Sequence, residues 1–263
     1  MTLNLGMWLL AFLPVLVVLV AMLVLHWNSK LAGAAALVTA VLVALLAFGA
    51  NLPLVAVAVG KSLLLSADVL FIIWGALLLY HVANEAGAVT VLGTALTRLT
   101  PDRMLQGLFL GWVFASFLQG MGGFGVPVAV AAPLLVQLGF SPISAVIMAC
   151  VGHGWAVNFG SLATSFTTLL AVTGLSGEAL APMSALLLWI AGYFCGLAVA
   201  YLAGGSRGLL RSIPAVVVLG TVMGWTQYAL AANGLWTLGS TGGGMAGLAV
   251  AAILPKLPVY PAP

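Results

Sequence analysis

The sequence predicts an all-α polytopic membrane protein that forms one transmembrane domain over residues 1–263. Hydrophobic residues make up 64% of the chain and charged residues only 4%, whereas a soluble domain has about 25% charged residues. The apolar residues gather into repeated runs, and a helix needs roughly 20 such residues to cross a bilayer. The seven Lys and Arg residues stand apart between these runs, so we expect no nucleic-acid partner.

Ten apolar runs are expected to be helical, and several are too short to cross a bilayer alone. They cover residues 7–25, 31–48, 69–82, 104–118, 126–138, 143–151, 162–172, 183–201, 215–230 and 243–254. The first run has neither a preceding Lys or Arg nor a following cleavage site, so we expect it to be a retained helix. Runs of about 10 to 14 residues are more typical of re-entrant or broken helices than of full crossings.

The Lys and Arg residues predict the orientation of the chain, because short cytoplasmic loops are enriched in them. The loops placed inside hold Lys30, Arg98 with Arg103, Arg207 with Arg211, and Lys256. The amino terminus is then outside and the carboxyl terminus inside. Between the inner loops the number of crossings must be even, so some of the five apolar runs there do not cross. The count closes if residues 104–138 form a re-entrant hairpin and residues 143–172 form one crossing built from two half-helices.

This scheme has about seven crossings and divides the domain into three parts. Residues 1–103 hold the first three helices, residues 104–201 the hairpin, the broken helix and the next helix, and residues 202–263 the last two helices and a short tail. The stretch 54–65 is expected to lie along the membrane interface, with Lys61 outside.

The first glycine-rich break is a candidate site for an anion. It contains Gln119, Gly120, Gly122, Gly123 and Gly125, and it ends at Pro127. Irregular backbone at membrane depth is tolerated only where it lines a cavity or is buried in protein, and a helix amino terminus offers free N–H groups. A small carboxylate would suit these donors. The alternative is a tight turn at the membrane surface that needs glycine only for its conformation.

The second break, residues 152–161, is expected to meet the first break and complete a substrate site. It contains His153 and Asn158. Ser161, Thr164, Ser165 and Thr168 then recur with the spacing of one helix face, and they could line a polar path. The alternatives are hydroxyls that bond the carbonyl one turn earlier and a histidine that is only a structural donor.

Two titratable residues, His153 and Asp68, are the candidates for proton coupling. Carboxylates within a membrane are costly enough to be functional candidates by default, and Asp68 is the acid expected nearest membrane depth. Cys150 and Cys195 lie inside apolar runs and far from metal-ligand spacing, so neither a metal nor another cofactor is expected. Paired carboxylates and a Ser/His/Asp set are also missing at plausible depth, so an enzyme is not expected.

Five stretches carry a resemblance to a known family. They are Thr100-Pro101-Asp102-Arg103 through Gly111, Phe117-Leu118-Gln119-Gly120, Gly123-Phe124-Gly125-Val126-Pro127-Val128-Ala129, Leu138-Gly139-Phe140 and Pro214-Ala215-Val216-Val217-Val218. In these stretches the chain resembles the L-lactate permease family, which also covers glycolate uptake. The resemblance runs from about residue 67 to residue 230.

The resemblance implies a secondary transporter that takes up lactate or a related small 2-hydroxy monocarboxylate across the bacterial cytoplasmic membrane by proton symport. Family members typically have glutamate at the position of Gln119, and they differ from this chain at residues 152–155. Coupling through Gln119 is therefore not expected, and substrate preference is expected to differ.

Family members are also about twice this length and hold two related halves, so the chain resembles the amino-terminal half of an inverted-repeat carrier. The expected partners are the lipid bilayer, the carboxylate, and a second half-carrier chain or a second copy of this chain. The alternative is a non-transporting or partner-dependent membrane subunit derived from such a carrier.

Overall fold

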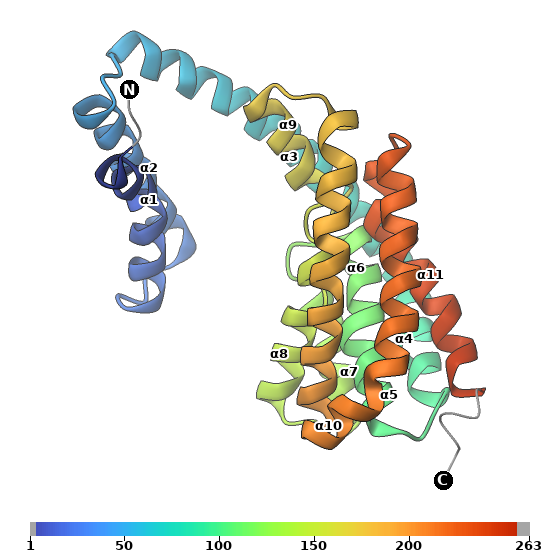
Figure 1. The fold of residues 1–263 in the computed structure, drawn as a ribbon. Helices are drawn as coiled ribbons and strands as arrows, with labels where there is room; N and C mark the ends of the chain where they lie inside the picture. Colours follow the sequence, from blue (N-terminus) through green and yellow to red (C-terminus); the bar gives the residue numbers. More distant parts are fainter. Residues whose placement is uncertain (1–3, 257–263) are drawn as a thin grey trace. The chain divides into compact units, whose positions relative to one another are not determined.

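A computed structural model describes residues 4–256, and every regular element in that range is a helix (Figure 1). Six of these helices are long and apolar enough to cross a bilayer. The predicted all-α polytopic membrane fold is therefore confirmed. The chain divides into two compact units, one ending at Ser66 and the other beginning at Ala67.

The first unit is built around two packed helices. They are α1 (Leu5–Leu23) and α2 (Ser29–Ala47). Asn4 and Asn28 cap them, because each side-chain oxygen accepts a hydrogen bond from a backbone N–H in the first turn. Most large apolar side chains of both helices are exposed, as expected for a surface that faces lipid.

One long helix, α3 (Leu52–Glu85), replaces two predicted elements. The prediction separated an interfacial stretch, 54–65, from a crossing at 69–82, but the structure makes them continuous. Pro53 lies in the first turn, where its missing N–H breaks no helical hydrogen bond, and no later proline interrupts the helix. Lys61 and Asp68 are both exposed on this helix and do not interrupt it. A short helix that the sequence did not predict, α4 (Ala88–Arg98), follows.

The segment after α4 folds back on itself. Its elements are α5 (Arg103–Leu108), a π-helical segment (Phe109–Phe114), α6 (Ala115–Met121) and α7 (Val126–Gln137). The Arg103 guanidinium donates to the Gly139 carbonyl at 2.6 Å and lies 4.6 Å from the centre of the Phe140 ring. The two ends of the segment therefore lie together, and its re-entrant course in a membrane stays a prediction.

A broken helix comes next, followed by the two long parts of α10 (Gly177–Ala232) and a last helix. The halves of the broken helix are α8 (Pro142–Gly152) and α9 (Thr164–Thr173), and they match the predicted runs at 143–151 and 162–172. Helix α10 turns back at Gly205, where φ is 63° and ψ is −159°. Glycine adopts this conformation readily because it lacks a Cβ atom. The last helix is α11 (Gly239–Ile253).

The centre of the second unit is the helical segment Arg103–Met121, most of which is buried. The Trp112 ring is fully buried, and a Cβ atom added at Gly196 would lie 2.7 Å from it. A Cβ atom at Gly152 would collide with the carbonyl oxygen of Gly111. Glycine therefore lets α8 and α10 approach the central segment at the distance that membrane helices use for packing.

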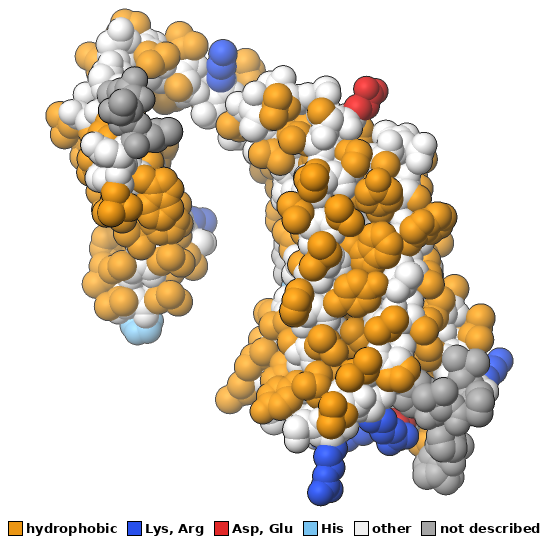
Figure 2. All heavy atoms as spheres, in the orientation of Figure 1, with side chains coloured by type: hydrophobic (Ala, Val, Ile, Leu, Met, Phe, Trp, Pro, Cys, Tyr) orange, Lys and Arg blue, Asp and Glu red, His pale blue; other side chains and the backbone are white. Residues whose placement is uncertain are grey.

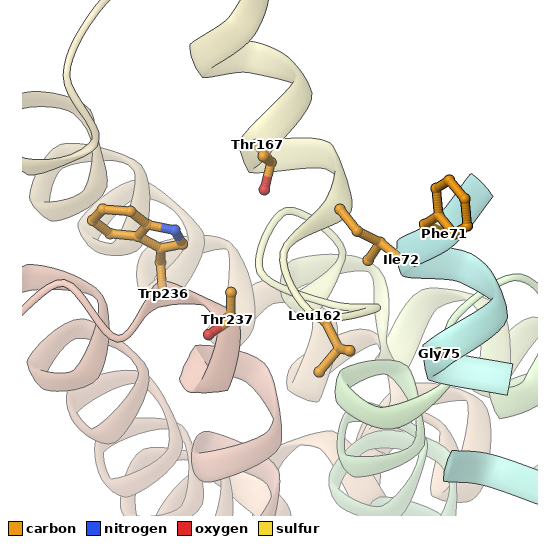
Figure 3. A pocket seen from close by; sticks show the side chains of 7 residues that line it. All are labelled: Phe71, Ile72, Gly75, Leu162, Thr167, Trp236 and Thr237. Carbon is orange, nitrogen blue, oxygen red and sulfur yellow. The ribbon is translucent and has the colours of Figure 1, made fainter. Parts of the chain in front are cut away.

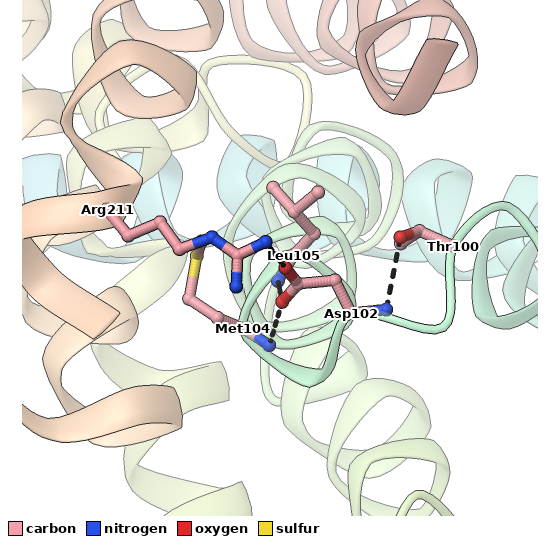
Figure 4. Close-up of polar contacts among 5 residues, drawn as sticks. All are labelled: Thr100, Asp102, Met104, Leu105 and Arg211. Atoms are coloured by element: carbon pink, nitrogen blue, oxygen red, sulfur yellow. Dashed lines mark hydrogen bonds and ion pairs between the residues drawn. The ribbon is translucent and has the colours of Figure 1, made fainter. Parts of the chain in front are cut away.

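One end of the second unit is basic. Figure 2 shows Lys and Arg side chains gathered where α5 and the bend of α10 lie. There the Arg211 guanidinium forms an ion pair with Asp102 at 2.8 Å, and the Asp102 backbone N–H donates to the Thr100 hydroxyl (Figure 4). The same carboxylate caps α5 by accepting from the backbone N–H groups of Met104 and Leu105. The predicted inner loops that hold Arg103 and Arg211 therefore lie close together, and the side of the membrane on which they lie stays a prediction.

Candidate functional site

The structure brings the two glycine-rich breaks into direct contact. The Ser161 backbone N–H donates to the Gln119 carbonyl at 2.8 Å, and the Leu162 N–H donates to the Gly120 carbonyl at 3.5 Å. A Cβ atom at Gly123 would collide with the Ser161 hydroxyl. Residues 119–123 and 160–162 therefore form one junction, as the sequence predicted.

Both breaks contain three consecutive residues with left-handed backbone. The φ values are 46° at Gly123, 39° at Phe124 and 92° at Gly125, and 48° at Ser161, 56° at Leu162 and 61° at Ala163. Residues other than glycine lose roughly 1–2 kcal/mol each in this conformation. Such strain persists only where the surroundings enforce it, and it is found preferentially at functional sites.

The first break presents backbone donors. Its N–H groups at Gly123, Phe124 and Gly125 donate to no acceptor within residues 4–256, and neither does the N–H of Val128 in the first turn of α7. The amino end of α7 adds the positive end of a helix dipole. The geometry can therefore receive a carboxylate without any cationic side chain.

Two buried polar side chains lie at the junction without a hydrogen-bond partner among the described residues. Gln119 is 5% exposed and Ser161 is 4% exposed. The Gln119 amide nitrogen lies against Gly160, where an added Cβ atom would be 2.6 Å away. The Gln119 amide and the Ser161 hydroxyl are not among the fully enclosed polar atoms of the described residues, so both are accessible to pair with a polar ligand.

His153 and Asn158 also belong to the second break. The Nδ1 atom of His153 lies 2.6 Å from the Ala149 carbonyl oxygen, so Nδ1 carries a proton and Nε2 is left to exchange one. Asn158 is half-buried, and its backbone carbonyl accepts from the N–H of Phe166 at 3.2 Å. Neither side chain forms a hydrogen bond with the first break.

The predicted stripe of four hydroxyls is not a single helix face. Ser161 lies in the left-handed turn before α9, so helical spacing does not apply to it. Thr164 donates to the Ser161 carbonyl at 2.6 Å and Thr168 to the Thr164 carbonyl at 2.9 Å. Ser165 is exposed. The threonines thus follow the alternative in which they bond nearby carbonyls, and Ser161 alone faces the first break.

Asp68 has no demonstrated link to either break. It is exposed on α3 and forms no hydrogen bond or ion pair with another residue that the structure describes. His153 is therefore the one proton-coupling candidate that lies within a break.

Sequence reasoning missed the first turn of α11, which touches both breaks. A Cβ atom at Gly120 would lie 2.5 Å from the backbone nitrogen of Thr241. The neighbouring Ser240 hydroxyl donates to the Ala156 carbonyl at 2.6 Å. The glycines of residues 239–244 were the available signal, since small residues allow close helix contacts.

An open cavity adjoins the second break. Its volume is about 680 Å³. It is lined by Phe71, Ile72, Gly75, Leu162, Thr167, Trp236 and Thr237 (Figure 3). Leu162 belongs to the same left-handed turn as Ser161, so one turn serves both the polar junction and this mainly apolar cavity.

Comparisons with known proteins point to one family. A family model described as L-lactate permease matches residues 7–258. Glycolate permease GlcA of Escherichia coli (strain K12) is 28% identical over 221 residues, which cover 84% of this chain and 40% of that relative. The L-lactate permease of Bacillus subtilis (strain 168) is 31% identical over 158 residues, which cover 60% of this chain and 28% of that relative.

A third relative gives the same picture. The L-lactate permease of Escherichia coli (strain K12) is 32% identical over 158 residues, which cover 60% of this chain and 29% of that relative. The chain thus spans less than half the length of these relatives. No solved structure matches it.

Proposed function

Since its family match over residues 7–258 makes this chain a member of the L-lactate permease family, as its motifs predict, we propose that it carries small 2-hydroxy monocarboxylates such as lactate or glycolate across the bacterial cytoplasmic membrane. The observation that supports this most is the junction of the two breaks, where free backbone N–H groups lie beside the buried Gln119 and Ser161. Broken helices repeatedly hold the substrate in secondary transporters.

The proposed binding mode divides the substrate between two kinds of donor. The carboxylate accepts from the N–H groups of the first break, and the 2-hydroxyl pairs with the Gln119 amide and the Ser161 hydroxyl. The full proposed set is Gln119, Gly120, Gly122, Gly123, Gly125, His153, Asn158, Ser161, Thr164 and Ser165. Within it Thr164 serves the shape of the turn, because its hydroxyl is bonded to the Ser161 carbonyl.

We assign proton coupling to His153 ahead of Asp68. Histidine changes charge readily near neutral pH, and the bond from Nδ1 to Ala149 leaves Nε2 as the exchanging atom. Replacing His153 with Gln should make uptake independent of an imposed pH gradient, whereas Asp68→Asn should leave that dependence intact. The opposite result would move the assignment to Asp68.

The proposed working unit contains a second half. The alignments cover 28% and 40% of the Bacillus subtilis and glycolate-permease relatives, and inverted-repeat carriers build one site from two halves. The partner is a second copy of this chain or another half-carrier chain. The alternative is a membrane subunit that does not transport by itself.

The test is uptake of labelled L-lactate and glycolate by vesicles that contain only this chain, with and without an uncoupler. Uptake abolished by the uncoupler would support a proton-driven carrier assembled from copies of this chain. No uptake by correctly inserted protein would favour the partner-dependent subunit.

Variants locate the site in the same assay. Gln119→Met keeps the side-chain volume but removes the amide, and it should lower uptake efficiency about tenfold to a hundredfold. The matched control is Gln137→Met, which changes an exposed residue at the end of α7. Equal effects of the two variants would contradict the proposed site.

A further inference from the structure

A buried hydrogen-bond chain links α10 and α11 to the second break. The Ser240 hydroxyl oxygen lies 2.6 Å from the Ala156 carbonyl oxygen and 3.1 Å from the Gln227 side-chain oxygen. Ser240 and Gln227 are both 0% exposed. Ala156 belongs to the short helical turn Gly154–Ala156 inside the second break.

The number of protons fixes the direction of this chain. A hydroxyl has one proton, and the shorter contact assigns it to the Ala156 carbonyl. The Ser240 oxygen must then accept a hydrogen bond from Gln227, so the Gln227 amide nitrogen faces it. Rotating the Gln227 amide by 180° exchanges its nitrogen and oxygen without changing its shape. The rotation gives a partner to the amide nitrogen, which is otherwise a buried donor without one.

The first turn of α11 also reaches the first break. Thr241, the residue after Ser240, lies against Gly120 so closely that an added Cβ atom would be 2.5 Å from its backbone nitrogen. Two consecutive residues of α11 therefore contact the two breaks, and Gln227 supports one of them from α10. A second anchor comes from the Trp155 indole N–H, which donates to the Ser116 hydroxyl at 2.9 Å.

We infer that Gln227 and Ser240 are positioning residues of the substrate site: through the Ala156 carbonyl they hold the second break in place against the first. They touch no substrate themselves. The effect on transport rests on the proposed function. The contact that keeps the second break against the first does not, because it lies within the polypeptide itself. Loss of either side chain lets the turn at 154–156 open more often.

Opening is measured by the labelling rate of a thiol introduced by Ala156→Cys, after Cys150 and Cys195 are replaced by alanine. Ala156 is 0% exposed, so this thiol is protected while the turn is closed and reacts when the turn opens. Ser240→Ala and Gln227→Met should each raise the labelling rate with N-ethylmaleimide about three- to tenfold, the effect of one lost hydrogen bond. The double variant should equal Ser240→Ala alone, because Gln227 acts on the break only through Ser240.

The matched control is Thr226→Ala, next to Gln227 on α10, whose hydroxyl bonds only the Val222 carbonyl at 2.8 Å. It should leave labelling unchanged. Labelling unchanged in Gln227→Met and Ser240→Ala, or raised equally in Thr226→Ala, would overturn the inference.

Transport supplies the second readout. In the same vesicles, Gln227→Met should raise the KM for lactate by a similar factor while Vmax per inserted molecule changes less than twofold. A side chain that merely stabilised the fold would lower the amount of transporter and leave KM alone. If wild-type protein takes up no lactate, the proposed function fails, and the labelling result still decides the inference.

Discussion

At the scale of single residues, neighbouring glycines of one segment have different surroundings. Gly160 lies against the Gln119 side chain, and an added Cβ atom would be 2.6 Å from the amide nitrogen and 2.8 Å from Cγ. Gly154 has nothing within 4 Å of such an atom. The contact between the two breaks therefore requires glycine at position 160 but not at position 154.

Alanine at these two positions should separate the effects. Gly160→Ala should reduce lactate uptake at least about tenfold, because the added methyl displaces Gln119 from the junction. Gly154→Ala should keep uptake within about twofold of wild type. Uptake per inserted molecule in vesicles is the measurement, and equal loss in both variants would argue against the junction as the site.

Ala163 offers a test of the backbone strain. Its φ of 61° is left-handed, so Ala163→Gly should remove roughly 1 kcal/mol of strain, and the net stability should stay level or rise. Ala181→Gly, in the helical part of α10 and equally buried, should instead destabilise by about 1 kcal/mol. Thermal unfolding in detergent compares them. A lower Tm for Ala163→Gly than for Ala181→Gly would contradict the strained turn.

The sequence indicated most of this site but not all of it. Glycine clusters between short apolar runs identified both breaks, because glycine and shortness are visible in composition. The left-handed turn at residues 161–163 contains no glycine, so no local signal revealed it. For this reason the spacing in the sequence predicted Ser161 on the same helix face as Thr164, Ser165 and Thr168. Ser240 and Gln227 were missed because their roles depend on contacts with residues 84 and 13 positions away.

At the scale of elements, Asp102 holds the start of the folded-back segment in two ways. Its carboxylate caps α5 and pairs with Arg211 of α10. The Asp102 side chain is 14% exposed and that of Arg211 is 53% exposed, so salt should partly screen the pair.

Two substitutions divide these contributions. Asp102→Asn keeps a capping oxygen and loses the charge, and it should cost at most about 1 kcal/mol. Asp102→Ala loses both and should cost about 1 kcal/mol more. Thermal unfolding in detergent at low and high salt measures this. An asparagine variant as unstable as the alanine variant would show that the cap contributes nothing.

Element boundaries were predictable where prolines, caps or glycines mark them. Ser141-Pro142 starts α8, and the Ser141 side chain accepts from the Ser144 N–H. The short helix α4 escaped prediction because its three threonines and Arg98 interrupt the apolar pattern. Residues 54–65 and 69–82 were expected as separate elements, but α3 is continuous, because exposed charges on a long helix do not end it.

At the scale of the whole molecule, the distribution of basic residues leads to a testable orientation. The amino terminus should be outside and the carboxyl terminus inside. A fluorescent or phosphatase reporter fused at either end in bacterial cells reports its side. A carboxyl terminus found outside would require a different number of crossings in the second unit.

The size of the assembly is the second prediction at this scale. Native mass spectrometry should give a complex with at least two copies of the 26.8 kDa chain, or one copy with a second half-carrier. A chain that is monomeric and active in uptake would contradict the requirement for a second half.

The π-helical segment Phe109–Phe114 has a consequence for how the site is aimed. A π-helical turn contains one residue more than the α-helical turn it replaces, and one residue corresponds to about 100° of rotation around the axis. The segment lies just before α6, so it sets the angular position of Gln119. Deleting a single residue between positions 109 and 114 would rotate Gln119 away from Ser161 while the segment Arg103–Met121 stays helical. A change in the number of residues, with no change in any side chain of the site, would then be enough to redirect it.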